Sequence, residues 1–242
     1  MGHLLEVIVT CLGLIPIFHV PIYLLATSCT NPLEFTKEYP DNWFYIIIPL
    51  VISFVYFSLG HLLVTKDTEN GLIKIIASLS LPTTATICGP LSIYIGTMTG
   101  NYSIVLYGEE YVPYLRVIGF CISLTGLLLL ISTNYYFLSQ GKGTLSPLIP
   151  TTKLVVDGPY KYVRNPMIAG VFYIIVGEAL CFNMMRLMIF AIYFFILNTV
   201  FFIFKEEPDL KDRFGEEFVE YCKHVSRWMY RFTPYIPEKK QA

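Results

Sequence analysis

The chain has 242 residues, of which 55% are hydrophobic and 14% are charged. Soluble domains carry roughly 25% charged residues, so the composition excludes disordered, collagen-like and ordinary soluble proteins. The net charge of −1 gives no electrostatic basis for binding nucleic acid. Most of the six cysteines lie inside apolar runs, where a cysteine acts as a small hydrophobic side chain. We therefore expect neither disulfides nor a metal site.

Six apolar runs predict an all-α, polytopic membrane protein. Four of them are long enough to cross a bilayer, which takes roughly 20 residues in a helix. These four are residues 4–26, 43–64, 72–98 and 112–138. The two shorter runs, 167–182 and 187–204, predict a tight helical hairpin whose first arm is short for a full crossing. The first run lacks the basic start and the small-residue cleavage pattern of a signal peptide.

Lysine and arginine are distributed unevenly between the loops of this six-span arrangement. With both termini in the cytoplasm, fourteen of the seventeen basic residues fall on the cytoplasmic side. Cytoplasmic loops of membrane proteins carry an excess of Lys and Arg, so we expect this orientation. The loop after the fourth run and the C-terminal tail then face the cytoplasm together.

Few polar groups interrupt the apolar runs. Pro82 and Gly89-Pro90 predict a kink or local unwinding in the third run, which is either structural or part of a substrate path. Glu178 lies in the fifth run and is an ionisable residue within the membrane. Such a residue is a functional candidate by default, and the alternative is a protonated carboxyl that forms a hydrogen bond between helices.

The loop at 139–166 is rich in residues that fix backbone turns. Gly141 and Gly143 allow a ligand to approach the backbone closely, and Gly158 before a proline predicts a turn. Arg164 precedes the start of the next helix, where free N–H groups favour anions. The spacing matches neither a P-loop nor a dinucleotide fingerprint. The loop is thus either a binding site or a stiff connector whose basic residues follow the positive-inside rule.

Two carboxylates, Glu206 and Glu207, follow the last apolar run, and Pro208 is placed to begin a new helix. Paired carboxylates beneath a membrane helix either complement the dipole of a solvated helix or bind a ligand. Farther along the tail, Trp228 and the aromatic residues after it predict an anchor at the membrane interface.

Two sequence motifs lie on either side of the hairpin. In one-letter code the first is GxGT at 141–144 followed by KLVxxGPYxYVRNPM at 153–167, and the second is EExxLxxxFGxxFxxYxxxVxR at 206–227. In this order they resemble the motifs of the superfamily of isoprenylcysteine carboxyl methyltransferases and phospholipid methyltransferases. The resemblance covers roughly residues 139–232.

The resemblance implies an integral membrane enzyme that transfers a methyl group from S-adenosylmethionine to a lipid-borne acceptor. Residues 1–138 would form a transmembrane region and 139–242 a catalytic region with a cytoplasmic active site. The membrane would be the endoplasmic reticulum in a eukaryote and the cytoplasmic membrane in a prokaryote. The residues that the resemblance assigns to the cofactor pocket are Gly141, Gly143, Thr152, Lys153, Leu154, Val155, Tyr160, Asn165, Pro166, Met167, Ile168 and Glu206.

The acceptor decides what else the site must supply, because methyl transfer is an in-line displacement that depends on positioning. A carboxylate acceptor needs a cation to orient it, which Arg164 offers. An amine acceptor must first lose a proton, which Glu207 could accept. We expect both residues to be catalytic. We favour carboxyl O-methylation of an isoprenylcysteine-like lipid or prenylated peptide, although eukaryotic enzymes of that kind have an arginine where this chain has Phe202. The alternatives are phospholipid N-methylation and a non-enzymatic transporter or scaffold.

Overall fold

A computed structural model describes residues 51, 55, 82–91, 93–94, 105–140 and 152–237. Within these ranges the chain forms helices and no β-strand, apart from one isolated antiparallel bridge between Val105 and Met184. The expected all-α class is confirmed for this part of the chain. The predicted run at 4–26 lies outside the described residues, as does nearly all of the run at 43–64.

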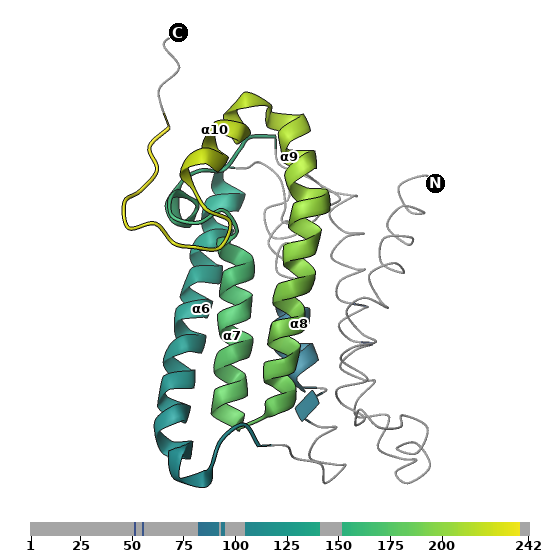
Figure 1. Cartoon of the computed structure of the whole chain (residues 1–242), viewed down its shortest axis with the longest axis vertical. Helices are drawn as coiled ribbons and strands as arrows, with labels where there is room; N and C mark the ends of the chain where they lie inside the picture. The colour runs from purple at the N-terminus through teal and green to yellow at the C-terminus, as the bar shows by residue number, and fades with distance from the viewer. Residues whose placement is uncertain are drawn as a thin grey trace.

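Three helices, α6 (Val112–Gln140), α7 (Pro166–Phe182) and α8 (Met185–Phe201), stand side by side with α7 in the middle (Figure 1). The helical stretches Glu109–Gln140 and Met185–Phe214 are long and apolar enough to cross a membrane, and α7 is a shorter apolar helix. The fourth run and the hairpin are thus confirmed as helices. The six-span arrangement extends beyond the described residues.

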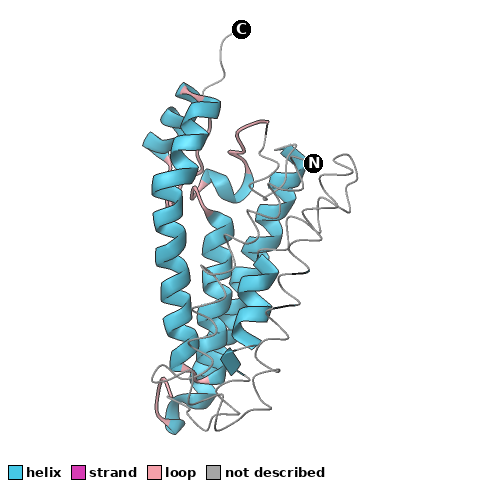
Figure 2. Ribbon diagram, turned by 90° about the vertical axis from the view of Figure 1, so that its right-hand side faces the viewer, coloured by secondary structure: helices cyan, strands magenta, loops and turns pink. Residues whose placement is uncertain are grey.

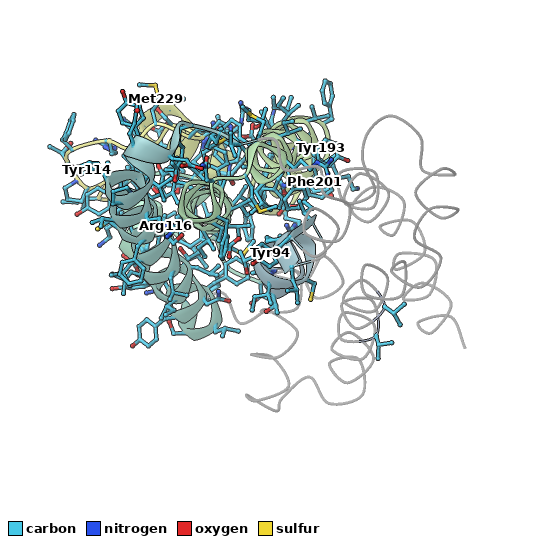
Figure 3. The ribbon with its side chains drawn as sticks, turned by 90° about the horizontal axis from the view of Figure 1, so that it is seen from below. Tyr94, Tyr114, Arg116, Tyr193, Phe201 and Met229 are labelled. Atoms are coloured by element: carbon cyan, nitrogen blue, oxygen red, sulfur yellow. The ribbon has the colours of Figure 1, made fainter. Side chains whose placement is uncertain are left out.

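The outward side of α6 is apolar and exposed, as contact with lipid requires. Tyr114, Phe120 and Leu128 are 71%, 63% and 59% exposed. Figure 3 looks along the bundle and places Tyr114 at its outer edge. Such a continuous exposed apolar face is unusual in a soluble protein and is typical of a membrane helix.

Four glycines bring α6 and α7 into backbone contact. A Cβ added at Gly119 would lie 2.6 Å from the carbonyl oxygen of Gly177, and one added at Gly126 would lie 2.6 Å from that of Gly170. Each glycine pair is seven residues from the next on both helices, so the two antiparallel helices keep one register. Small residues at helix interfaces permit such close approach in membranes. These contacts fix both the distance and the register of the α6–α7 pair.

The turn between α7 and α8 is shorter than the predicted four-residue linker. Asn183 has a left-handed backbone with φ of 54°, and the N–H groups of Asn183 and Met184 donate to carbonyls in the last turn of α7. This is a Schellman motif, which satisfies the carbonyls at a helix end. The Asn183 side chain accepts from the N–H groups of Leu106 and Tyr107 at 2.9 and 3.0 Å. The turn between α7 and α8 is therefore hydrogen-bonded to the segment that leads into α6.

Two π-helical turns each end two residues before a proline. One is Thr84–Cys88 before Pro90, and the other is Phe202–Glu206 before Pro208. A proline within an α-helix loses one hydrogen bond, and its ring clashes with the carbonyl four residues earlier. The wider π turn relieves that clash. The predicted break in the third run is thus a π turn, and the chain passes from α8 through a second π turn into α9 (Glu207–Phe214) instead of starting a separate helix.

Helices α9 and α10 (Glu216–His224) cover one end of the bundle, the upper end in Figure 1, which we call the capped end. Gly215 joins them with φ of 56° and ψ of −132°, a conformation that is accessible mainly to glycine. The chain after α10 then returns to the loop that precedes α7, as Figures 1 and 2 show from two sides.

Trp228 does not act as the interfacial anchor that the sequence predicts. Its ring lies 4.8 Å from that of Phe195 and 6.1 Å from that of Phe202, between centroids. It therefore packs into the helical core, because the tail bends back over α7 and α8. The following residues Met229 and Phe232 are exposed.

Substitution of Gly126 by valine tests the glycine contacts. The added side chain meets the Gly170 backbone, which cannot move without separating the helices, so we expect the free energy of unfolding to fall by about 1–3 kcal/mol. The measurement is thermal or denaturant unfolding of purified protein in detergent. Cys121→Val, on the exposed side of α6, is the matched control, and equal stability of the two variants would contradict the close contact.

Candidate active site at the capped end

The loop before α7 folds against the capped end of α6. Gly158 has φ of 59°, and a Cβ at this position would collide with the ring of Tyr136. The predicted turn at Gly158 is confirmed as the short 3-10 helix Gly158–Lys161. Tyr160 is buried, and its ring centroid lies 6.4 Å from that of Phe137. The turn is thus held on two aromatic side chains of α6.

The C-terminal tail binds this loop mainly through backbone hydrogen bonds. The Tyr221 hydroxyl donates to the Tyr160 carbonyl at 2.6 Å. The three backbone bonds, each 3.0 Å, run from the Arg164 N–H to Ser226, from the Arg231 N–H to Tyr162 and from the Tyr235 N–H to Lys161. The loop and the tail therefore form one folded unit, although about 60 residues separate them.

Glu207 lies between two arginines at the centre of this unit. Arg227 donates to its two carboxylate oxygens from Nε at 2.6 Å and from Nη2 at 2.8 Å. Arg164 Nη1 lies 3.2 Å from Glu207 Oε1 and donates to Cys222 Sγ at 2.7 Å. The three charged side chains are only 13–27% exposed. A carboxylate engaged by two guanidinium groups is a poor proton acceptor, so the geometry favours a positioning role for Glu207 toward Arg164.

Burial raises the pKa of two groups near this ion pair, Cys222 and Tyr160. Burial raises the pKa of the Cys222 thiol, and the nearby Arg164 opposes that rise only in part. Burial also raises the pKa of the Tyr160 phenol above its usual range, with further contributions from Tyr221 and Glu206. Both groups are therefore protonated at neutral pH. The effect of Glu206 on Tyr160 shows that this carboxylate lies within electrostatic range of the loop.

The residues that the sequence predicts for the cofactor pocket differ in their solvent exposure. Thr152 and Lys153 are exposed, while Leu154 and Met167 are half-buried. Those that are buried are Val155, Tyr160, Asn165, Pro166 and Ile168. Glu206 is half-buried at the end of the π turn, and Gly141 and Gly143 lie outside the described residues. The loop residues and Glu206 thus meet at the capped end, whereas Met167 and Ile168 pack mainly in the helical core.

One comparison with known proteins gives a match that includes this region. Residues 115–217 match the family model of phospholipid methyltransferases. That family lies within one superfamily with the isoprenylcysteine carboxyl methyltransferases, and the match supports a membrane methyltransferase. No curated protein and no solved structure matches the chain.

The family match includes parts of the chain that lie outside the two motifs. The match begins in α6, close to its first turn, and ends in the first turn of α10. It therefore includes Arg164, Glu206 and Glu207, and also the whole glycine contact between α6 and α7.

Two buried side-chain nitrogens of the loop that precedes α7 have no partner among the residues that the structure describes. They are Arg164 Nε and Asn165 Nδ2. Asn165 precedes the first residue of α7, yet its side chain makes no capping bond there. An unpaired buried polar group costs about 1–3 kcal/mol, so these donors fit hydrogen bonding to a polar ligand. No cluster of three potential metal ligands occurs within the described ranges.

Sequence reasoning missed the roles of Arg227 and Cys222. The sequence did mark Arg227, because this residue ends the second motif. Its partner Glu207 lies 20 residues earlier, and no local sequence pattern predicts that the two form an ion pair. Glu178 lies near the opposite end of α7, away from this cluster. Its Oε2 is buried and has no hydrogen-bond partner in the described part of the chain.

Arg227→Gln tests the ion pair between Glu207 and Arg227 at the candidate site. It leaves Glu207 half-buried with one guanidinium, so we expect the free energy of unfolding to fall by about 1.5–3 kcal/mol. The control Arg213→Gln changes an exposed arginine on α9. Urea unfolding followed by tryptophan fluorescence reports the change, because Trp228 follows Arg227 directly in the chain. If both variants unfold alike, the pair does not hold the tail.

Proposed function

We propose that the protein is an integral membrane methyltransferase that uses S-adenosylmethionine and acts on a lipid-borne acceptor. The observation that carries this proposal is the position of Arg164. The Arg164 side chain is only 13% exposed, is oriented by Glu207 and lies where the apolar helices end. A cation so placed can orient an anionic group of a molecule whose tail remains in the bilayer. The family match at 115–217 supports methyl transfer as the chemistry.

The residues that would hold the methyl donor are those gathered at the capped end. When bound, S-adenosylmethionine supplies an electrophilic methyl group on a cationic sulfonium. Glu206 offers a negative charge that favours such a cation, and Asn165 offers an unpaired donor. Tyr160 and Val155 provide buried surface for the adenine. Gly141 and Gly143, which the first motif assigns to the same cofactor, lie outside the described residues.

A carboxylate acceptor agrees best with the geometry of Glu207. Its oxygens are already engaged by Arg227 and Arg164, so it is poorly suited to take a proton from an amine. A carboxylate needs no base and requires only orientation and charge neutralisation. Phe202, which stands where eukaryotic isoprenylcysteine enzymes have an arginine, packs edge-on against Trp228. Arg164 then takes over the contact with the substrate carboxylate.

Phospholipid N-methylation is the second candidate, and the name of the matching family favours it. The amine would arrive from the bilayer and would lose its proton to a base other than the engaged Glu207. In both cases we place the capped end in the cytoplasm, because the basic residues of the loop and the tail gather there. The membrane is the endoplasmic reticulum in a eukaryotic source and the cytoplasmic membrane in a prokaryotic one.

Calorimetric titration with S-adenosylmethionine tests the donor site. We expect saturable binding to the wild-type protein and binding about tenfold weaker or more in Glu206→Ala, because a charged contact is lost. Glu217→Ala removes an exposed carboxylate on α10 and serves as the control. Absence of binding to the wild type would refute the methyltransferase proposal.

Transfer of a labelled methyl group in proteoliposomes tests the acceptor. We expect labelling of a farnesylcysteine analogue, with phosphatidylethanolamine as the competing substrate. Arg164→Ala should lower kcat by about 100-fold, as expected when a preorganised charge contact is removed, with less effect on donor binding. Labelling of phosphatidylethanolamine alone would exclude O-methylation, and equal loss of turnover and donor binding would show that Arg164 is misassigned.

A further inference from the structure

Two polar side chains of α6, Thr133 and Asn134, are buried near the capped end and belong to neither motif. Thr133 is 0% and Asn134 is 7% exposed. Asn134 Nδ2 donates to the Leu130 carbonyl at 3.0 Å. However, Asn134 Oδ1 and Thr133 Oγ1 are buried without a hydrogen-bond partner among the described residues. By contrast, Thr125 and Thr199 each donate to the carbonyl one turn earlier at 2.8 Å.

Unpaired polar atoms are especially unfavourable inside a membrane helix bundle. Water that could bind them elsewhere is absent from the hydrocarbon region. A threonine in a helix normally avoids this cost by donating to its own backbone, as Thr125 does. The exception at Thr133, directly beside a second unpaired acceptor, indicates that both atoms face a polar partner.

The glycine register shows which part of the chain lies opposite these atoms. A Cβ on Gly170 would lie 3.2 Å from the Leu130 nitrogen, so α7 begins beside the turn of α6 that contains Thr133 and Asn134. Continuing the same antiparallel register places both residues within one helical turn of Asn165. Asn165 carries the unpaired buried donor Nδ2. Three unpaired atoms, two on α6 and one on the residue just before α7, therefore lie at one level of the bundle.

The same level lies directly beneath the proposed donor pocket. Phe137 is one turn beyond Thr133 on the same side of α6, and its ring packs against Tyr160. Tyr160 is in turn within electrostatic range of Glu206. The polar atoms of α6 thus lie one helical turn below the contact of Phe137 with Tyr160, a residue of the proposed donor pocket.

The hydrogen-bonding capacity of these atoms restricts the ligand group. Thr133 can donate and accept, Asn134 Oδ1 only accepts, and Asn165 Nδ2 only donates. A carboxylate would be repelled by the Asn134 oxygen, because both groups only accept hydrogen bonds. An ammonium group would leave the Asn165 donor unpaired, because both groups only donate. A vicinal diol satisfies all three, because each hydroxyl both donates and accepts.

We propose that Thr133 and Asn134, together with Asn165, bind the ribose hydroxyls of the methyl donor. The proposal rests on the proposed function and adds to it a contribution from α6, upstream of both motifs. The glycine contacts between α6 and α7 then have a second role, since they set the position of these two side chains relative to Asn165.

The test measures ligand binding and stability rather than turnover. Thr133→Val and Asn134→Leu are compared with the wild type and with Thr125→Val, a control in the same helix whose hydroxyl is bound to its own backbone. The ligands are S-adenosylhomocysteine and 5′-methylthioadenosine, which shares the ribose and lacks the amino-acid part. Calorimetry gives the Kd, and thermal unfolding of the ligand-free protein gives Tm.

We expect the Kd for both ligands to rise by about threefold to tenfold in each of the two variants, as the loss of one hydrogen bond predicts. The Tm of ligand-free Thr133→Val should be unchanged or higher, because an unpaired hydroxyl is replaced by a methyl group. Unchanged Kd values in both variants, with normal wild-type binding, would overturn this proposal and leave the methyltransferase function standing. Weaker binding of S-adenosylhomocysteine alone would overturn the assignment to the ribose. Failure of the wild type to bind either ligand would instead overturn the proposed function.

Discussion

The carboxylate of Glu207, held between Arg164 and Arg227, is the interaction on which the capped end depends. It joins the loop before α7, the start of α9 and the C-terminal tail. Charged groups are costly to bury unless they are paired and hydrogen-bonded. Each of these three segments therefore constrains the other two, and Arg164 is oriented as a result of their assembly rather than by its own loop.

An apolar constraint of comparable importance acts lower in the bundle. The glycine contacts fix the distance between α6 and α7. The seven-residue spacing of the glycines on both helices fixes the register of the pair. The ion pair holds the site together from outside the bundle, while the backbone contact sets the level at which α7 starts. The site is built where these two constraints meet.

Local patterns in the sequence predict the elements but not their contacts. The apolar runs predict α6 and the hairpin to within a few residues, and the two motifs mark the loop and the tail. The sequence does not reveal that Glu207 pairs with Arg227, because tertiary pairing has no local periodicity. It also misassigns Trp228, since an aromatic residue in a polar tail is typical of an interface anchor and the return of the tail to the core is a long-range event. The π turn before Pro208 was missed because the same proline can also begin a helix.

The hydrogen bonds between the tail and the loop have a consequence for biosynthesis. Ser226, Arg231 and Tyr235 supply partners to residues 161–164, so the loop cannot take its final form until those late residues have left the ribosome. The membrane helices can insert before that time, because their apolar length suffices. A nascent chain arrested shortly after α8 would therefore be an inserted membrane protein without an active site. Assembly of the capped end is thus separated in time from insertion of the helices.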